Sequence, residues 1–486
     1  MKIGILLLLC SLLSGCNDFL EEMSQDEIRP STVDDMEQLL NGEAYTRLFA
    51  DYILNVTEIF TDDIECRGAV GWDAESAKIT LEKGKWKFTW QKGMFEEGEG
   101  GNIVDYWELP YRKIKGCNVV LDYLDKVEGS KTRKENLRGE ALTLRAFYYL
   151  MLVNFFGQPY NIGDPEKNLG VPLKLHMDVT EELFLRNSVA EVYRCIESDL
   201  LEGNRLLEEN DLPKTYHRMD HLAAKALLSR MYLYMENWDK ALEYADKVLE
   251  INSTLLCLSD SDDPMSSRGE RGVYNINTPD EIIWCRPEGS LLGGFNMQAY
   301  GVSSDLINLF ELRPGENLRL DLRYYNYFVT AYDANWNELP DVVCKDRKDG
   351  NLGIRTAEMY LNRAEAYIHK YLDAGVEEYR LKALSDLNYL RQHRYDTRFV
   401  DYKDVDIKDG HELLMFYKEE RRRELCGESN HRWFDLRRYG MEELKHIYFV
   451  NPGEEQEFIL QDNSPRYVLP IPKQVLEYNR KLVQNP

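Results

Sequence analysis

The segment from His221 to Ile251 constrains the fold more than any other part of this chain. It holds two apolar stretches, His221–Glu236 and Lys240–Ile251, on either side of a short polar turn. Apolar residues that recur every three or four positions predict helices with one buried face. Small residues on both stretches would let the two helices cross closely: Ala223, Ala224, Ala226, Ala241 and Ala245. The segment therefore predicts two antiparallel helices packed through alanines.

A helix pair of this kind, about 34 residues long, is typical of a tetratricopeptide repeat. A second pair is predicted from Thr356 to His393, and single helices from Leu137 to Phe156 and from Val189 to Leu207. Such pairs cannot bury their apolar faces alone, so they must stack on neighbours. The sequence predicts a mostly α fold, in which tetratricopeptide-like helix pairs form a scaffold with long loop-rich inserts and a few short β-strands.

The scaffold is predicted in two blocks, at roughly residues 107–256 and 354–440. The loop-rich inserts lie at roughly residues 60–105 and 257–353. These inserts are long for simple connections, and long ordered loops often carry function. We therefore expect the ligand-side surface of the protein to be built from the inserts.

Short strands are predicted inside these inserts. Lys85–Trp90 alternates lysine or threonine with Trp86, Phe88 and Trp90, which predicts a strand with one buried face. Glu281–Trp284 predicts a second strand, whereas Asp333–Gly353 is rich in polar and turn-forming residues and predicts a loop.

The first residues predict export and a lipid anchor. Lys2 is followed by an apolar run from Ile3 to Leu13 and then by Ser14-Gly15-Cys16. A positive start, an apolar middle and small residues before a cleavage point are typical of a secretory signal. A cysteine directly after the cut resembles a bacterial lipoprotein box, so we predict a signal peptide at 1–15 and lipid on Cys16. An ordinary cleaved signal or a short anchor are the alternatives, but the run is shorter than the ~20 residues of a spanning helix.

Charge and cysteine content exclude several classes of function. The formal net charge is −25, so nucleic acid is a poor partner because phosphate would be repelled. Nine cysteines are present without a CxxC pair, which argues against a metal knuckle or a thioredoxin-like centre. His217 and His221 could share a helix face as metal ligands, but no third ligand is evident. No metal or cofactor is expected beyond the covalent lipid.

Ordered motifs along the chain point to one family. The following segments carry them: Cys16-Asn17-Asp18-Phe19-Leu20; Trp107, Tyr111, Ile114 and Asn118; Gly139-Glu140-Ala141 with Leu144-Arg145-Ala146-Phe147-Tyr148-Tyr149; Phe156-Gly157-Gln158-Pro159-Tyr160; Ala223 to Arg230; Ala364-Glu365-Ala366; Glu419 to Leu425; Arg432 to Arg438; and Leu469-Pro470-Ile471-Pro472. In this order and spacing the chain resembles the SusD/RagB family of outer-membrane nutrient-binding lipoproteins, nearly from end to end. The stretch Cys426 and Ser429 to His431 departs from the family pattern.

The resemblance implies a single SusD-like domain over residues 16–486, with a helical scaffold and a loop-built face opposite. It implies a cell-surface protein, lipid-anchored in the outer membrane, that binds an oligosaccharide. Its partner would be a SusC-like TonB-dependent transporter, which receives the glycan, and the protein itself would not be an enzyme. A peptide ligand, a surface glycoside hydrolase and a purely structural scaffold that binds only proteins are the alternatives.

Sugars present C–H faces and hydroxyl edges, so their sites combine flat aromatic rings with polar side chains. On position in the loops, we predict Trp72, Trp336, Tyr300 and Phe295 as stacking residues. The polar candidates for hydroxyl contacts are Asp62, Asp63, Asn296, Gln298 and Arg286. A capped helix end or a solvated loop would account for these polar residues equally well.

Other charged residues are predicted to be structural. Arg421 to Arg423 are interleaved with Glu419, Glu420 and Glu424 at helical spacing, which predicts internal ion pairs and not an anion site. Glu140 and Arg145 are predicted to be buried partners. Pairs of carboxylates are expected by chance in a chain with 85 acidic residues, so they do not indicate a glycosidase.

Overall fold

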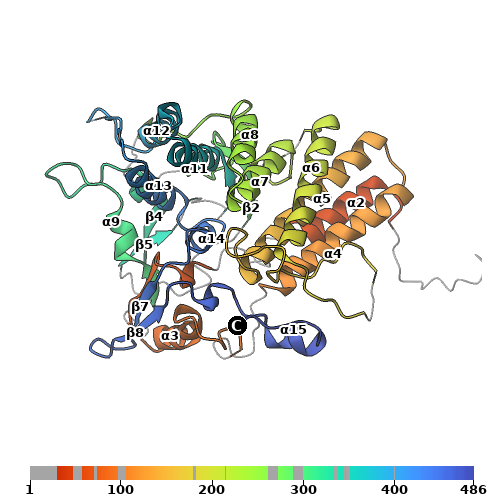
Figure 1. Ribbon diagram of the computed structural model, residues 1–486, viewed down its shortest axis with the longest axis horizontal. Coiled ribbons are helices and arrows are strands. Elements are labelled where there is room, and N and C mark those ends of the chain that lie inside the picture. Colours follow the sequence, from red (N-terminus) through yellow and green to blue (C-terminus); the bar gives the residue numbers. More distant parts are fainter. Residues whose placement is uncertain are drawn as a thin grey trace, which may run out of the picture.

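Helices dominate the computed structural model, as the sequence predicted (Figure 1). The structure describes residues 30–46, 57–69, 74–96, 106–178, 182–213, 215–260, 272–287, 299–332, 338–343, 345, 351–398 and 400–486. The α-helices are α2 (Val33–Leu39), α3 (Ala74–Phe88), α4 (Glu108–Tyr123), α5 (Lys131–Phe156), α6 (Val189–Glu209), α7 (His221–Tyr234), α8 (Trp238–Leu249), α9 (Ser304–Asn308), α10 (Arg323–Tyr327), α11 (Thr356–Ala374), α12 (Glu377–Gln392), α13 (Gly410–Leu425), α14 (His431–Arg438) and α15 (Lys473–Tyr478).

The strands form small antiparallel ribbons of two strands each. They are β1 (Ile64–Cys66) with β3 (Tyr300–Val302), β2 (Ile282–Pro287) with β6 (Asn351–Arg355), β4 (Phe328–Tyr332) with β5 (Glu338–Val343), and β7 (Leu444–Tyr448) with β8 (Gln456–Leu460). The predicted strand at Glu281–Trp284 is confirmed by β2. The predicted loop at Asp333–Gly353 is wrong in part, because β5 and the start of β6 fall inside it.

The two predicted helix pairs are confirmed. They are α7 with α8 and α11 with α12, and Figure 1 shows the four helices side by side along one edge of the molecule. The Ser229 hydroxyl donates to the carbonyl of Ala241 at 3.1 Å, which ties α7 to α8 where the alanines let them approach. The Trp238 ring stacks on His369 of α11 with centroids 4.1 Å apart. The second pair therefore closes the apolar face of the first, as stacked repeats require.

A close crossing of α5 and α6 builds the other half of the scaffold. Gly139 and Gly203 face each other there, and a Cβ on Gly203 would lie 2.6 Å from the hydroxyl of Thr143. Side chains at either glycine would push the helices apart. Helix α5 begins at the cap Ser130, which accepts from the backbone N–H of Arg133, and is buried over most of its length.

The strand predicted at Lys85–Trp90 is wrong, because its first four residues form the last turn of helix α3. Its buried residues are Ala77, Leu81, Gly84, Lys87 and Phe88, most of them spaced by three or four positions. This longer helical period outweighs the short alternation around the tryptophans. Trp90 is buried beyond the helix end and donates to the carbonyl of Phe60 at 2.9 Å, whereas Trp86 remains 36% exposed.

A buried ion network joins the second insert to α13. The carboxylate of Glu424 accepts from Arg323 at 3.1 Å, Arg355 at 2.7 Å and Arg394 at 3.0 Å. All four side chains are fully buried. Burial alone would raise the pKa of Glu424, yet Arg394, Arg355 and Arg323 together lower that pKa well below its usual value. The network therefore holds an ionised carboxylate in the interior.

Replacing Glu424 by alanine is expected to lower the free energy of unfolding by about 3–5 kcal/mol, because three buried arginines would lose a shared counter-charge. Chemical denaturation monitored by circular dichroism measures the change. Glu419→Ala is the matched control on the same helix, since Glu419 is 53% exposed and lies 3.8 Å from Arg423. The control should change stability by no more than about 0.5 kcal/mol. Equal effects of the two changes would contradict this account.

Candidate ligand-binding site

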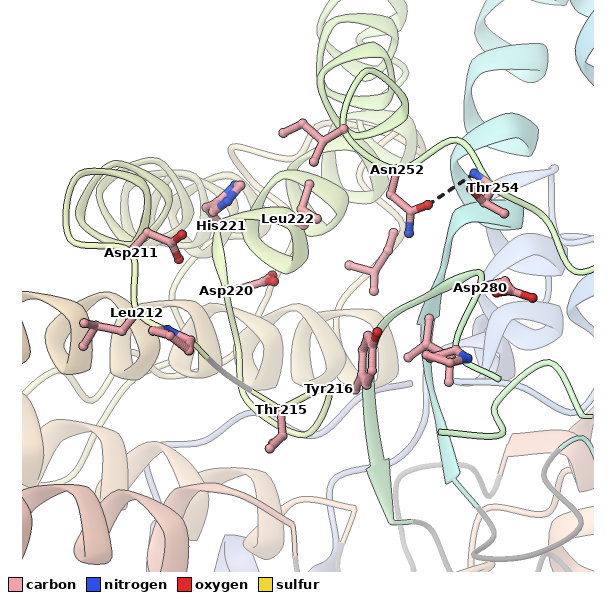
Figure 2. Close-up of a pocket in the computed structure, with 15 residues that line it drawn as sticks. Asp211, Leu212, Thr215, Tyr216, Asp220, His221, Leu222, Asn252, Thr254 and Asp280 are labelled. Carbon is pink, nitrogen blue, oxygen red and sulfur yellow. Dashed lines mark hydrogen bonds between the residues drawn. The ribbon is translucent and has the colours of Figure 1, made fainter. Parts of the chain in front are cut away.

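A cavity of about 570 Å³ opens beside the connection from α6 to α7. Its walls also include the residues after α8 and the turn before β2 (Figure 2). The polar lining residues are Asp211, Thr215, Tyr216, Asp220, His221, Asn252, Thr254 and Asp280, and the apolar ones are Leu212, Pro213, Leu222, Ile251, Pro279, Ile282 and Ile283. A cavity of this size, with apolar surface and several polar groups, is large enough for a small ligand.

The chain from Tyr216 to the start of α7 is held by hydrogen bonds and an ion pair. Its carbonyl accepts from the N–H of Cys285 in β2 at 2.8 Å. Two residues later, Arg218 donates to both carboxylate oxygens of Glu140 at 2.6 and 3.0 Å. Asp220 then caps α7 by accepting from the N–H of Ala223 at 2.8 Å. The Tyr216 side chain itself remains 40% exposed.

The opposite wall is held as well. The Asn252 carbonyl oxygen accepts from the N–H of Thr254 at 3.2 Å, and Figure 2 shows its amide nitrogen turned toward the cavity. The neighbouring carbonyl of Ser253 accepts from the hydroxyl of Tyr360 at 2.9 Å. Asp280 directly precedes Glu281, whose buried carboxylate accepts from Arg394 of the ion network at 2.9 Å. The cavity therefore has walls fixed to the core on two sides.

A second cavity of about 400 Å³ lies next to the first. Leu212, Pro213 and Thr215 line both cavities, so these three residues lie on the ridge between them. The second cavity is rich in polar groups from α2, α5 and the α6–α7 connection: Glu37, Asn41, Arg133, Asn136, Glu140 and Arg218.

The sequence-predicted residues Asp62 and Asp63 are bound to arginines of the protein itself. Arg432 donates to both oxygens of Asp62 at 2.8 and 2.7 Å, and Arg422 donates to Asp63 at 2.6 Å. Burial alone would raise the pKa of Asp62, but Arg432 and Arg422 lower it to about 2. Burial raises the pKa of Asp63, in spite of Arg422. This placement does not fit the prediction that the two side chains contact ligand hydroxyls.

Tyr300 is buried, a placement that does not fit its predicted stacking role. It is 3% exposed in β3, its hydroxyl donates to the carbonyl of Leu81 at 2.8 Å, and its ring packs on Phe88. A Cβ on Gly84 would lie 2.5 Å from this ring, so the glycine allows α3 to rest on it. The ring of Tyr300 is therefore covered by other residues of the protein.

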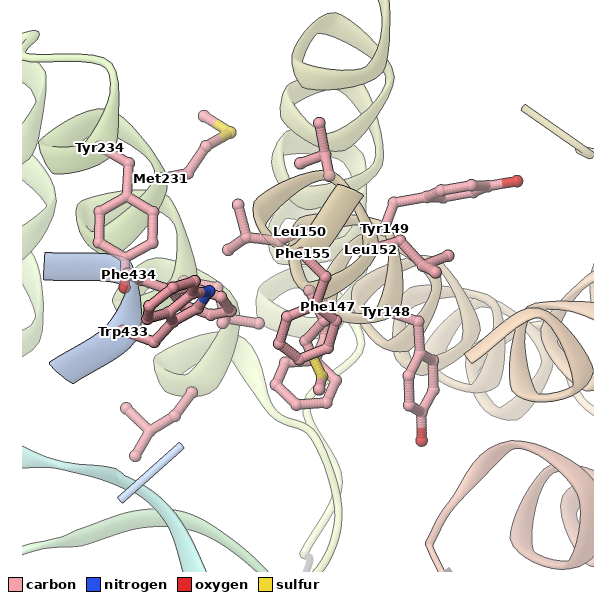
Figure 3. Packing of buried hydrophobic residues seen from close by; sticks show 14 of the residues in the cluster. Phe147, Tyr148, Tyr149, Leu150, Leu152, Phe155, Met231, Tyr234, Trp433 and Phe434 are labelled. Atoms are coloured by element: carbon pink, nitrogen blue, oxygen red, sulfur yellow. The ribbon is translucent and has the colours of Figure 1, made fainter. Parts of the chain in front are cut away.

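Arg286 is buried beside the aromatic core, a placement that does not fit its predicted contact with ligand hydroxyls. It is 2% exposed, and its guanidinium lies 5.7 Å from the ring centre of Phe147. Figure 3 shows Phe147 on α5 facing the aromatic side chains of α7 and α14, among them Tyr234 and Phe434. The Trp284 ring meets Phe147 edge-on at 5.2 Å, so β2 is also attached to this core.

The remaining candidates lie outside the described residues: Trp72, Trp336, Phe295, Asn296, Gln298 and the lipidation site Cys16. Their predicted roles therefore stay predictions.

The run Arg421 to Arg423 has structural partners, as predicted, although not all of them lie on the same helix. Arg423 donates to Glu420 at 2.8 Å, but Arg421 donates to Asp435 of α14 at 2.7 Å. Glu140 and Arg145 are buried and ion-paired, yet not with each other, which corrects their predicted pairing. Arg145 binds Asp199 at 2.7 Å, and Glu140 binds Arg218.

Within the described residues, no cluster of His, Cys, Asp or Glu is arranged to hold a metal ion. His217 lies before α7 and contacts the carbonyl of Cys285 at 3.2 Å, whereas His221 lies 3.2 Å from the Nζ of Lys225. Over the same part of the chain, no helix has the length and apolar character needed to span a bilayer.

Sequence reasoning did not identify Tyr216. It is one of 31 tyrosines and stands in a polar connection without a glycine bend or a family motif. Only the exposure of its ring beside a cavity marks it, and that property requires the fold.

The comparison with known families identifies the chain. A family described as "Starch-binding associating with outer membrane" matches residues 18–233, and the SusD family matches residues 323–486. The chain belongs to the SusD/RagB family, whose members are non-catalytic binding proteins associated with the outer membrane. No match is found among proteins with curated descriptions.

Solved structures share the same fold. A putative sugar-binding protein from Bacteroides vulgatus is 22% identical, with a TM-score of 0.68 over 95% of this chain and 99% of that one. A SusD superfamily protein from Bacteroides thetaiotaomicron is 21% identical, with a TM-score of 0.69 over 94% of this chain and 100% of that one. A SusD-like carbohydrate-binding protein from Bacteroides vulgatus is 22% identical, with a TM-score of 0.66 over 93% and 97%.

Asp62→Asn is expected to destabilise the protein at pH 7 by about 1–3 kcal/mol, because the amide cannot replace the charge that Arg432 and Arg422 bind. The pKa of about 2 in the folded protein lies below the usual value of 3.8, so this stabilisation is complete above about pH 4. It is lost as the pH falls toward 2. The difference in melting temperature between wild type and Asp62→Asn should therefore shrink from pH 6 to pH 3. A constant or growing difference would contradict the assignment.

Proposed function

We propose that this protein is a cell-surface lipoprotein that binds oligosaccharides and delivers them to a SusC-like TonB-dependent transporter in the outer membrane. The membership of the SusD/RagB family carries the proposal, because the family matches cover both ends of the chain and include a starch-binding description. The fold shared with sugar-binding proteins of known structure supports it. Residues 16–486 would form one domain with the lipid at Cys16.

The ligand would bind on the face built by the inserts at 60–105 and 257–353. Trp72, Trp336 and Phe295 are the proposed stacking rings, and Asn296 a proposed hydroxyl contact. Flat rings match the C–H faces of sugars, while amides and carboxylates match the hydroxyl edges. Four of the predicted residues would support the site without contacting the ligand: Asp62, Asp63, Tyr300 and Arg286. Their contacts would hold β1, β2 and β3, the strands next to these loops.

Trp72→Ala and Trp336→Ala are each expected to weaken glycan binding by about ten-fold, since each removes a stacking ring. Isothermal titration of the purified protein against neutral and acidic oligosaccharides measures the effect. Trp238→Ala is a matched control, because Trp238 is the first residue of α8 and stacks on His369 of the scaffold. It should keep the wild-type affinity. Binding of peptides and of no glycan would replace this function by peptide capture.

The anchor can be tested separately. Cys16→Ala is expected to move the protein from the outer-membrane fraction to the soluble fraction, because the acyl chains would be missing. Membrane fractionation and mass spectrometry of the mature N-terminus measure the change. Cys257→Ala is the control, since Cys257 lies within the folded body. Membrane retention of Cys16→Ala without lipid would contradict the proposed anchor.

A further inference from the structure

We propose that the cavity beside Tyr216 is a second glycan-binding site, which takes an uncharged oligosaccharide. It lies at the α6–α7 connection of the scaffold and is closed on one side by the second insert, which contributes Pro279, Asp280, Ile282 and Ile283. None of the residues predicted to contact ligand on the insert face lines it. The inference rests on the proposed function in one respect, namely that the natural ligands of this protein are glycans.

The side chains around the cavity match the surface of a sugar. Tyr216 is 40% exposed and Ile251 is 56% exposed, and both line the cavity, which supplies flat and apolar surface for C–H groups. Figure 2 shows Tyr216 between Asp220 and Asp280, with Asn252 and Thr254 across the opening. Carboxylates accept from hydroxyl groups and an amide can both donate and accept, so hydroxyl edges would find partners on several sides.

The charge of the lining selects among sugars. Asp211, Asp220 and Asp280 place three carboxylates on the cavity. Lys225, the cation next to His221, is 5% exposed on its side chain and pairs with Glu208 at 3.3 Å. The protein as a whole carries a formal charge of −25. Uronic acids and sulfated sugars would therefore be repelled, whereas neutral sugars would not.

The site is organised before any ligand binds. The Tyr216 carbonyl is fixed to β2, Arg218 to Glu140, and the Asp220 carboxylate to the start of α7. Across the cavity, Tyr360 fixes the carbonyl of Ser253. A rigid platform loses little conformational entropy on binding, which favours affinity for a weakly interacting ligand such as a sugar.

The neighbouring cavity would accommodate further sugar units. It begins on the far side of Leu212, Pro213 and Thr215 and has a volume of about 400 Å³. The Asn41 side-chain oxygen accepts from Arg218 at 2.6 Å, which leaves its amide nitrogen to donate to a hydroxyl group. The two arginines on this wall are paired with carboxylates of the protein, Arg133 with Asp34 and Arg218 with Glu140. A linear oligosaccharide that crosses this ridge would fill both cavities, so the site should prefer longer chains to monosaccharides.

Hydrogen–deuterium exchange of the full mature protein tests the site directly. The probes are the neutral hexasaccharides of glucose, xylose, mannose and galactose, with hexagalacturonic acid as the charged comparison. At least one neutral probe should slow exchange in peptides that cover 215–222 and 251–254. Tyr216→Ala should abolish this protection and weaken the corresponding binding by about ten-fold. Tyr478→Ala is the matched control, since Tyr478 is 77% exposed on α15, and it should leave protection unchanged.

The outcomes separate this site from the insert face. Binding that is lost in Trp72→Ala and Trp336→Ala, without protection of 215–222, would overturn the second site and leave the proposed function standing. Protection by the galacturonic acid probe alone would overturn the assignment to uncharged sugars. Failure of every glycan to bind would overturn both proposals. Melting temperatures of Tyr216→Ala and Tyr478→Ala that match the wild type would confirm that the variants are folded.

Discussion

The ionised carboxylate of Glu424, buried among Arg323, Arg355 and Arg394, is the interaction on which the arrangement of the chain depends most. Removing such a charge from water is costly, and only complete pairing offsets the cost. The three arginines come from the start of α10, the junction of β6 with α11, and the segment just after α12. Loss of any one of the three arginines would leave the buried charges of the network unbalanced. The second insert and the helical scaffold are therefore ordered together.

Ion pairs from helix α13 connect further parts of the molecule in the same way. Successive residues of a helix point about 100° apart, so Arg421, Arg422 and Arg423 leave α13 in different directions. Arg421 reaches Asp435 of α14, and Arg422 reaches Asp63 at the start of β1. One short run of arginines thus fixes the C-terminal helices and the first insert to the same support. This explains a run of three basic residues in a strongly acidic chain without any anionic ligand.

The sequence was most informative where an apolar period continues over many residues, as in the helix pairs α7–α8 and α11–α12. It failed where the pattern was short. The alternation of Trp86, Phe88 and Trp90 covers too few positions to outweigh the helical period that begins at Ala77. Long-range partners could not be inferred either, because Glu140 and Arg145 share one helix but bind Arg218 and Asp199 from other segments. Such pairings follow from the packing of the helices, and that packing cannot be read from the sequence.

The ligand-binding residues were equally hard to predict from the sequence, for a chemical reason. Aspartate, arginine and tyrosine serve both to bind sugars and to satisfy buried polar groups, so residue type and loop position do not separate the two uses. The contrast between Tyr300 and Tyr216 does separate them. The Tyr300 hydroxyl donates to Leu81 and its ring is covered by Phe88, whereas the backbone of Tyr216 is bound to β2 while its ring faces a cavity. An aromatic ring that lines a cavity, on a backbone tied to the core and beside exposed carboxylate and amide groups, is the arrangement from which we infer a ligand platform.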